Sequence, residues 1–385
     1  MLPPTQAGHY EGLRTMGIGA NQEERASLSE RMRAEIRGLP AVERAEIDES
    51  LHRMQWNESA YDFPADLKEE VLQQLAARAW SRYPLALRPF RLTDALARTL
   101  GVEPNQIVAA GGSSEVIRVV MSALLGAGDA VVMPTPTFLL YRRYARMLGA
   151  RICEIQLHAA DDFALPVDSM IEAARAEQAR AVVLCAPNNP TGTVYAQADV
   201  ARLAAGCACA VVIDEAYLEF SGQELLPLVE THPNIILIRT FSKAYRMAGV
   251  RVGYAVAAAE VAAQLQKGVN SFALSVFQEV VAEVALAHAH RFADGVAEVI
   301  AERERLAAGL RALPGVIVFG SGTNFLLVQP ACDVKALIRH LLEVERVLVS
   351  DNGGYAELAG MLRVTVGTPE ENDMVLRGFA ACCRD

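Results

Sequence analysis

The chain has 385 residues, and 36 lysine and arginine residues stand against 46 aspartate and glutamate residues, for a formal net charge of −10 at pH 7. Hydrophobic residues make up 52% and charged residues 21%, as in ordinary globular proteins, which excludes wholesale disorder. The acidic balance argues against a nucleic-acid-binding protein, because such proteins usually present a basic face.

Residues 1–60 are polar, with one predicted helix at Ser27–Ile36. From about residue 61 to 290, short apolar runs alternate with helical patterns, which is typical of a mostly parallel sheet covered on both faces. The predicted strands are Ile107–Ala110, Ala130–Met133, Ala181–Cys185, Ala210–Ile213, Ile235–Ile238 and Val252–Val256. The helical patterns between them include Glu115–Leu125, Phe138–Leu148, Gln197–Ala205 and Ala258–Gln266.

The last third of the chain has a different character. One long helical pattern covers Val276–Leu313, and the later predicted elements are a helix at Val334–Leu342, strands near Val347–Val349 and Leu362–Val366, and a helix from about Glu370. This order indicates a smaller α+β domain. We therefore expect an N-terminal arm with part of the small domain at 1–60, a large α/β domain at 61–290, and the rest of the small domain at 291–385.

The sequence shows no segment that predicts a membrane or secretory location. The uncharged stretch at 312–332 is interrupted by proline and glycine, so two strands and a turn are expected there. Residues 1–22 lack the apolar segment of a secretory signal, and we expect a location in the reducing cytoplasm. Seven cysteines, including Cys207-Ala208-Cys209 and Cys382-Cys383, lack a partner pair at zinc spacing, so we expect reduced thiols and no metal site.

Four polar loops follow predicted strands, at the edge of an open α/β sheet where ligands bind. Gly111-Gly112-Ser113-Ser114-Glu115 opens a helix, and the N–H groups of its first turn favour an anion, although an ordinary capped helix start is the alternative. Ala186-Pro187-Asn188-Asn189-Pro190-Thr191-Gly192 predicts a tight turn, from which the amide of Asn189 could reach a ligand.

The other two loops supply ionisable groups. In Asp214-Glu215-Ala216-Tyr217, a carboxylate ends a buried strand, where it needs a partner such as a cationic ring nitrogen unless Asp214 caps a helix. In Thr240-Phe241-Ser242-Lys243-Ala244, Lys243 is either a surface lysine or a nucleophile whose pKa is lowered by burial and by cations such as Arg251. Together the loops supply what pyridoxal 5′-phosphate (PLP) requires of a protein, which is a lysine for the Schiff base and an acidic partner for the pyridine nitrogen.

In this combination and order, the motifs resemble the class I/II aminotransferases of fold type I, and within them the histidinol-phosphate aminotransferase group, from about Gln55 to the C-terminus. The resemblance implies a large domain with a mostly parallel seven-stranded sheet, and a homodimer with the active site at the domain and subunit interface. It implies ping-pong transfer of an amino group from an amino acid or amino-alcohol phosphate, histidinol phosphate-like or aromatic, to 2-oxoglutarate. Other PLP chemistry, such as phosphothreonine decarboxylation, stays open because a fold does not determine a reaction.

The resemblance also implies residue roles. Lys243 would hold PLP as a Schiff base and move the substrate proton, and Asp214 would pair with the pyridinium nitrogen. Tyr217 and Asn189 would donate hydrogen bonds to the phenolic oxygen of the cofactor. Phe138 would stack on the cofactor ring, Tyr83 would contact the neighbouring subunit's cofactor and substrate, and Arg363 and Asn189 would bind the substrate. The cofactor's phosphate would be bound by Gly112, Ser113, Ser114, Thr240, Ser242 and Arg251.

One departure from the family pattern concerns the substrate. The histidinol-phosphate aminotransferase group usually has an arginine in a V-R-D-like context, where this chain has Val349-Ser350-Asp351. Arginine can bind a phosphate group with two parallel hydrogen bonds. We therefore expect that phosphate-bearing donors are not strongly preferred, and that an apolar or aromatic amino acid serves as well.

Overall fold

The computed structural model describes residues 28–40, 48–84, 86–352 and 354–383. The chain forms two compact units, Met1–Val42 and Glu43–Asp385. In the first unit the described helix is α1 (Ala34–Arg37), so the predicted helix at Ser27–Ile36 is wrong in its extent, and Ser27 lies outside the described residues. No residue of α1 is buried, and a short helix without packing contacts gains little stability.

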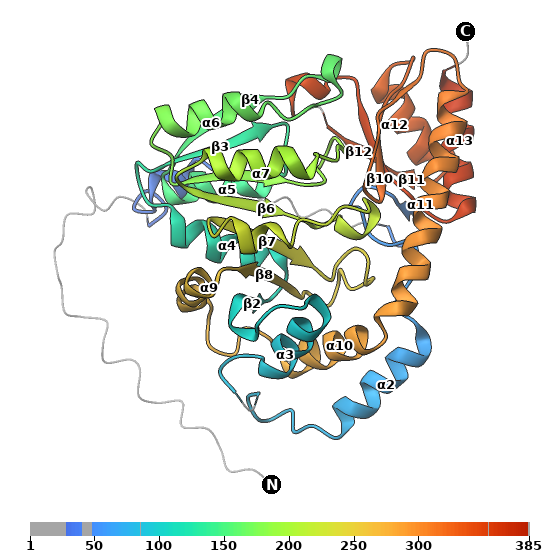
Figure 1. Cartoon of the computed structure of the whole chain (residues 1–385). Coiled ribbons are helices and arrows are strands. Elements are labelled where there is room, and N and C mark those ends of the chain that lie inside the picture. The colour runs from blue at the N-terminus through green and yellow to red at the C-terminus, as the bar shows by residue number, and fades with distance from the viewer. Residues whose placement is uncertain (1–27, 41–47, 85, 353, 384–385) are drawn as a thin grey trace, which may run out of the picture. The chain divides into compact units, whose positions relative to one another are not determined.

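Seven strands form the central sheet of the second unit (Figure 1). Their order is β2-β8-β7-β6-β5-β3-β4, and all pairs are parallel except the two made by β8. The strands are β2 (Ile107–Ala110), β3 (Ala130–Thr135), β4 (Arg151–Gln156), β5 (Ala181–Cys185), β6 (Ala210–Asp214), β7 (Ile235–Thr240) and β8 (Gly253–Ala257). The mostly parallel seven-stranded sheet is confirmed. The edge strand β4 was not predicted from the sequence, because its partly exposed residues form no continuous apolar run.

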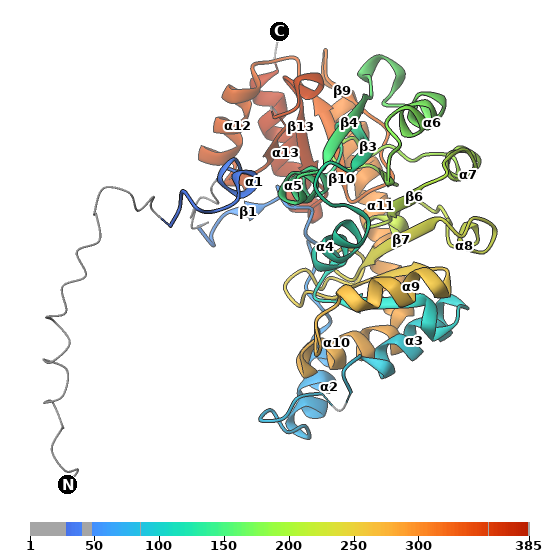
Figure 2. The same cartoon turned by 90° about the vertical axis from the view of Figure 1, so that its left-hand side faces the viewer.

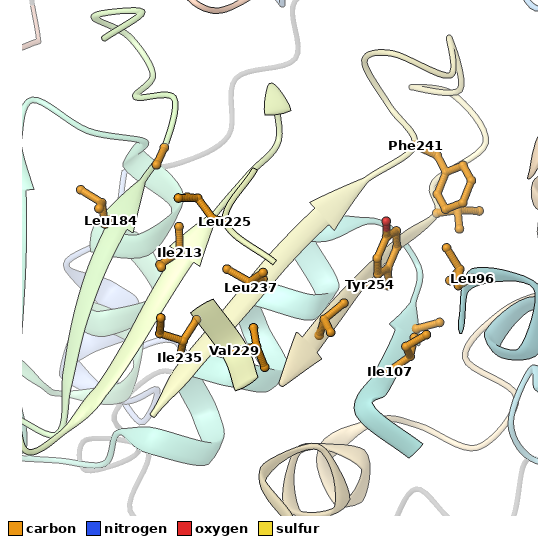
Figure 3. Packing of buried hydrophobic residues seen from close by; sticks show 14 of the residues in the cluster. Leu96, Ile107, Leu184, Ile213, Leu225, Val229, Ile235, Leu237, Phe241 and Tyr254 are labelled. Carbon is orange, nitrogen blue, oxygen red and sulfur yellow. The ribbon is translucent and has the colours of Figure 1, made fainter. Parts of the chain in front are cut away.

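Helices cover both faces of this sheet (Figure 2). One face packs against α4 (Ser113–Leu124), α5 (Leu139–Leu148) and α9 (Ala259–Leu265). The other packs against α2 (Ala65–Ala76), α3 (Phe90–Leu100), α6 (Val167–Ala176), α7 (Gln197–Gly206), α8 (Leu228–Thr231) and α10 (Val276–Ala287). Side chains alternate between the two cores, as strand geometry requires, so Ile213 packs on the second face and Val212 on the first. Figure 3 shows Leu184, Ile213, Leu237 and Tyr254 in the core of the second face.

The C-terminal part has its own antiparallel sheet of order β12-β13-β10-β9. Its elements are β9 (Ile317–Val318), β10 (Phe325–Gln329), β12 (Ser350–Asp351) and β13 (Leu362–Thr365), with α12 (Val334–Glu343) and α13 (Pro369–Cys382) packed beside them (Figure 1). β1 (His52–Arg53) pairs in parallel with β11 (Val347–Leu348). This pairing joins the segment that precedes α2 to the C-terminal part of the chain. The division into 1–60, 61–290 and 291–385 stays a prediction.

The long helix predicted at Val276–Leu313 is two helices, α10 and α11 (Ala289–Arg311). The break falls at His288, whose backbone leaves the helical region at φ −115° and ψ 27°. The physical reason is packing, because α10 lies on the core of the central sheet, whereas α11 extends from Phe292 in that core to Leu310 in the core of the C-terminal part. None of the described helices is long and apolar enough to cross a membrane, and 312–332 contains the two expected strands β9 and β10.

Candidate active site

A cavity of about 390 Å³ lies where β5, β6 and β7 end and β8 begins. Its lining brings together residues that are far apart in the sequence, as expected at the carboxyl edge of a parallel sheet. Apart from Gly112 and Tyr83, every residue that the sequence predicted for the cofactor or substrate lines this cavity. They are Ser113, Ser114, Phe138, Asn189, Asp214, Tyr217, Thr240, Ser242, Lys243, Arg251 and Arg363.

Small residues let the backbone and a guanidinium meet at one end of the cavity. Gly112 precedes α4 with φ +88°, and a Cβ atom there would lie 2.6 Å from Nη2 of Arg251. Close by, a Cβ atom on Gly253 would lie 2.3 Å from the backbone nitrogen of Ser113. The start of a 12-residue helix, the Arg251 guanidinium and the serine hydroxyls thus surround one pocket. This donor set suits an anion such as phosphate.

The turn after β7 shapes the same end of the cavity. The hydroxyl of Thr240 donates to Oγ of Ser242 at 3.0 Å, and the backbone N–H of Ser242 donates to Oγ1 of Thr240 at 3.1 Å. Both side chains are buried. These bonds hold the turn in the conformation that brings Lys243, the next residue, to the cavity.

The amine of Lys243 lies between the N-terminal segment and Tyr217. Its Nζ donates to the carbonyl oxygen of Trp56 at 3.0 Å and lies 6.0 Å from the centre of the Tyr217 ring. Burial lowers the pKa of Lys243 to about 8, and the nearby Arg363 and Arg251 act in the same direction. The amine is still mostly protonated near physiological pH, but its neutral fraction, the form that attacks a carbonyl, is far larger than for an ordinary lysine.

The carboxylate of Asp214 is buried at the end of β6, with 4% of the residue exposed. The Tyr141 hydroxyl donates to its Oδ2 at 2.9 Å, and the Ala216 N–H donates to its Oδ1 at 3.1 Å. Burial raises the pKa of Asp214 to about 6, although both hydrogen bonds oppose the rise. A cationic group next to this carboxylate would favour its ionised form.

Tyr217 receives two amide hydrogen bonds at its hydroxyl oxygen. Nδ2 of Asn57 donates at 2.8 Å and Nδ2 of Asn189 at 3.3 Å. Burial raises the pKa of Tyr217 to about 12, so the hydroxyl keeps its proton. Because the oxygen already accepts two bonds, its own O–H is left to donate to a bound ligand.

Arg363 enters the cavity from β13 of the C-terminal sheet. Its Nη1 donates to Oδ1 of Asn189 and its Nη2 to the carbonyl oxygen of Gln55, each at 2.6 Å. Its buried Nε has no hydrogen-bond partner among the described residues. The guanidinium is thus fixed in place and keeps one N–H that is not used by the described residues. Burial lowers the pKa of Arg363 without removing its charge.

Two predicted residues lie outside the lining. Gly112 sits behind the Arg251 guanidinium and shapes the pocket through its backbone. Tyr83 is 75% exposed, stacks on Phe272 with ring centres 4.5 Å apart, and lines a separate groove. Its predicted role concerns a neighbouring subunit and stays a prediction.

The sequence did not single out several residues that shape the cavity. Tyr141 bonds Asp214 from within an amphipathic helix, where nothing distinguishes it from a core tyrosine. Cys185 could have been found as the last residue of a buried strand. The sequence also assigned no role to the lining residues Trp56, Asn57, Glu58, Pro187, Ala216 and Ala248. Among the described residues, no group of three or more His, Cys, Asp or Glu side chains is placed to hold a metal ion.

The donor set fits PLP, because it offers an anion pocket, a depressed lysine pKa, a buried carboxylate and an aromatic ring from Phe138 in one cavity. The fold and the site together define a fold type I PLP-dependent enzyme. Residues 52–379 match the family model "Aminotransferase class I and II". The chain belongs to this family and is a PLP-dependent aminotransferase that acts on small molecules.

Known relatives agree on the subgroup that the chain resembles. It is 38% identical over 344 residues to a histidinol-phosphate aminotransferase of Chlorobaculum tepidum, covering 88% of this chain and 97% of the relative. It is 37% identical to the Chlorobium limicola enzyme of the same name, covering 85% and 91%. The crystal structure of histidinol-phosphate aminotransferase from Sinorhizobium meliloti in complex with PLP superimposes with a TM-score of 0.81 at 25% identity, covering 91% of this chain and 98% of that one.

Proposed function

We propose that this aminotransferase moves an amino group from an amino acid or an amino-alcohol phosphate to 2-oxoglutarate in a ping-pong reaction. The observation that supports this most is the guanidinium of Arg363, which is held in the same cavity as the amine of Lys243 and keeps a free Nε donor among the described residues. A fixed cation beside the reactive amine suits the carboxylate that 2-oxoglutarate and amino acids share.

When bound, PLP would supply the electron sink that stabilises a carbanion at the substrate Cα. Lys243 would bind the cofactor covalently and then, once released, carry the proton away from Cα as a general base. Asp214 would hold the ring nitrogen protonated through its charge, and Tyr217 and Asn189 would donate to the phenolic oxygen. The phosphate would be held by Ser113, Ser114, Thr240, Ser242 and Arg251, with Gly112 shaping their pocket.

The donor follows from the groups near Arg363. The names of the relatives favour histidinol phosphate. This chain has Ser350 where an arginine would add a second cation, and the partly exposed Trp56 in the cavity lining offers aromatic surface to a donor side chain. We therefore infer that an aromatic or apolar amino acid is used about as well as a phosphate-bearing amino alcohol.

A donor screen tests this function. Purified enzyme is given 2-oxoglutarate with histidinol phosphate, phenylalanine or phosphothreonine, and glutamate and carbon dioxide are both measured. We expect glutamate with the first two donors and no carbon dioxide. Carbon dioxide from phosphothreonine without glutamate would identify a decarboxylase instead. Failure of all donors to produce glutamate would contradict the proposed function.

We also propose a homodimer, because Tyr83 lies on an exposed aromatic and apolar surface. Trp80 is 78% exposed, Leu72 is 62% exposed, and these side chains line a groove of about 990 Å³ together with Phe272 and Phe277. Exposed apolar patches of this kind mark protein interfaces. Light scattering should give twice the chain mass of 41.6 kDa, and a monomeric mass with full activity would refute the proposal.

A further inference from the structure

A buried ion pair lies directly behind the candidate active site. Glu215 follows Asp214 in the sequence, and Arg239 precedes Thr240. Nε of Arg239 donates to Oε2 of Glu215 at 2.7 Å, and the two side chains are 7% and 0% exposed. Neither side chain lines the cavity.

Strand geometry explains why the pair is close to the site but faces away from it. Successive side chains of a strand point to opposite faces of the sheet. Ile236 and Ile238 of β7 pack on the α4 and α5 face, whereas Ile235 and Leu237 pack on the α7 and α8 face. Arg239 therefore belongs to the α7 and α8 face and Thr240 to the face of the cavity, and the same alternation separates Glu215 from Asp214.

The pair ties together the ends of the two strands that supply most of the reactive groups. β6 and β7 are parallel neighbours, with Asp214 beside Ile238, and the Glu215 N–H donates to the Ile238 carbonyl at 2.8 Å. This backbone bond and the ion pair both link β6 to β7 where the two strands end, just before the chain turns toward Lys243. The position of Asp214 relative to the turn at Thr240 therefore depends on them.

Stability alone does not account for this arrangement. A buried ion pair contributes little compared with apolar side chains of similar volume, because removing two charges from water is costly. Oε1 of Glu215 and Nη2 of Arg239 also have no hydrogen-bond partner among the described residues, although Nη2 lies 3.7 Å from Oε1 of Glu224. What the pair provides is a directional link at one point between two strands.

We propose that Glu215 and Arg239 are positioning residues, which hold Asp214 and the Thr240–Lys243 turn at the separation that the cofactor requires. This inference rests on the proposed function and deepens it. It adds two residues that touch neither cofactor nor substrate and act on the reaction from the opposite face of the sheet.

The test replaces both charges by unbranched apolar side chains in Glu215→Met/Arg239→Met, which keeps the volume and leaves no buried charge unpaired. The affinity for PLP is measured by absorbance titration, with kcat, KM for the donor and the unfolding of the apoprotein in urea. We expect cooperative unfolding to persist and PLP affinity to fall about tenfold or more. We expect kcat to fall about 10- to 100-fold while KM stays within about threefold, because misplacement by a fraction of an ångström impairs chemistry more than substrate binding.

Arg303→Met is the matched control. Arg303 is also buried at 7% exposure, and its Nη1 donates to the carbonyl oxygens of Phe220 and Thr323, but it does not line the cavity. We expect this variant to lose stability while its PLP affinity and kcat stay within about twofold of the parent, as for a purely structural arginine.

A folded Glu215→Met/Arg239→Met enzyme with PLP affinity and kcat within about twofold of the parent would overturn the inference. If that variant does not fold, Arg239→Lys decides: lysine keeps the charge but not the planar geometry of the guanidinium. We expect kcat to fall at least about threefold in Arg239→Lys, and an unchanged kcat would also overturn the inference. A parent enzyme that forms no glutamate with any donor would instead refute the proposed function, so the two failures are distinguishable.

Discussion

Ser350 and Arg363 lie directly opposite each other on the antiparallel strands β12 and β13. Opposite residues of such a pair point to the same face of the sheet, with Cβ atoms about 5 Å apart. Ser350 is partly buried and does not line the cavity, whereas the longer side chain of Arg363 reaches it. An arginine at position 350 would therefore extend beside Arg363 toward the substrate.

This geometry predicts the effect of Ser350→Arg. A second guanidinium should add one charge-assisted contact to a phosphate group, worth about 1.5–3 kcal/mol, so kcat/KM for histidinol phosphate relative to phenylalanine should rise about tenfold to a hundredfold. Ser350→Gln, which adds length without charge, is the matched control and should change the ratio little. A parent enzyme that already prefers histidinol phosphate by several orders of magnitude would contradict our interpretation of Ser350.

Lys243 should be the residue that holds PLP. Borohydride reduction of the PLP-loaded enzyme followed by peptide mapping should place the label on Lys243 and not on the exposed Lys267. Because the pKa of Lys243 is lowered to about 8, the rate at which the apoprotein captures PLP should rise with pH and level off above about 8. In Arg363→Met this midpoint should move to higher pH, since a cation that disfavours the charged amine is removed. A label on another lysine would refute the assignment.

Asp214→Asn should leave PLP bound but slow turnover by orders of magnitude. The phosphate pocket is untouched by this change, whereas a neutral amide cannot stabilise a protonated ring nitrogen. Turnover and PLP content are measured on the same preparation, with the exposed Asp168→Asn as control. Near-normal turnover of Asp214→Asn would show that Asp214 does not act on the ring nitrogen.

Asp214 should also make the stability of the apoprotein depend on pH. Its folded pKa of about 6 lies above the ordinary value of 3.8, so between these pH values the folded state binds more protons than the unfolded state. The free energy of unfolding should therefore decrease as pH rises from about 4 to 6, by up to roughly 3 kcal/mol. Urea unfolding at pH 4.5 and 6.5 measures this, and Asp214→Asn should lack this contribution to the decrease. Equal pH dependence in both proteins would contradict the raised pKa.

Gly253→Ala should weaken PLP binding. The added methyl group would lie 2.3 Å from the backbone nitrogen of Ser113, so the turn that precedes α4 must move. We expect PLP affinity to fall about tenfold or more, since a displacement of this size breaks hydrogen bonds to the phosphate. Gly249→Ala lies in the loop just before β8, with no atom within 4 Å of the new methyl group, and should bind PLP like the parent. Equal affinities in the two variants would refute the close packing of β8 under the phosphate pocket.

The sequence alone determined the main elements of the central sheet and the residue types at their ends. Runs such as Ala181–Cys185 and Ile235–Ile238 are apolar throughout, and a strand buried on both faces accommodates such a run. The residues that follow them had to lie at one edge, because parallel strands end on the same side. For this reason the order of strands and polar loops along the chain is enough to group Asn189, Asp214 and Lys243 in one site.

Only the tertiary structure decided the contacts that depend on distant segments. The bond from Tyr141 to Asp214, the bond from Asn57 to Tyr217, and the pairing of Ser350 with Arg363 each join separate elements of the chain, and nothing in the local pattern specifies the partner. The break at His288 was likewise invisible, because the helical periodicity continues through it while the packing surface changes. Local periodicity reports which face of a segment is buried, whereas the partner on that face is set by how the whole chain packs.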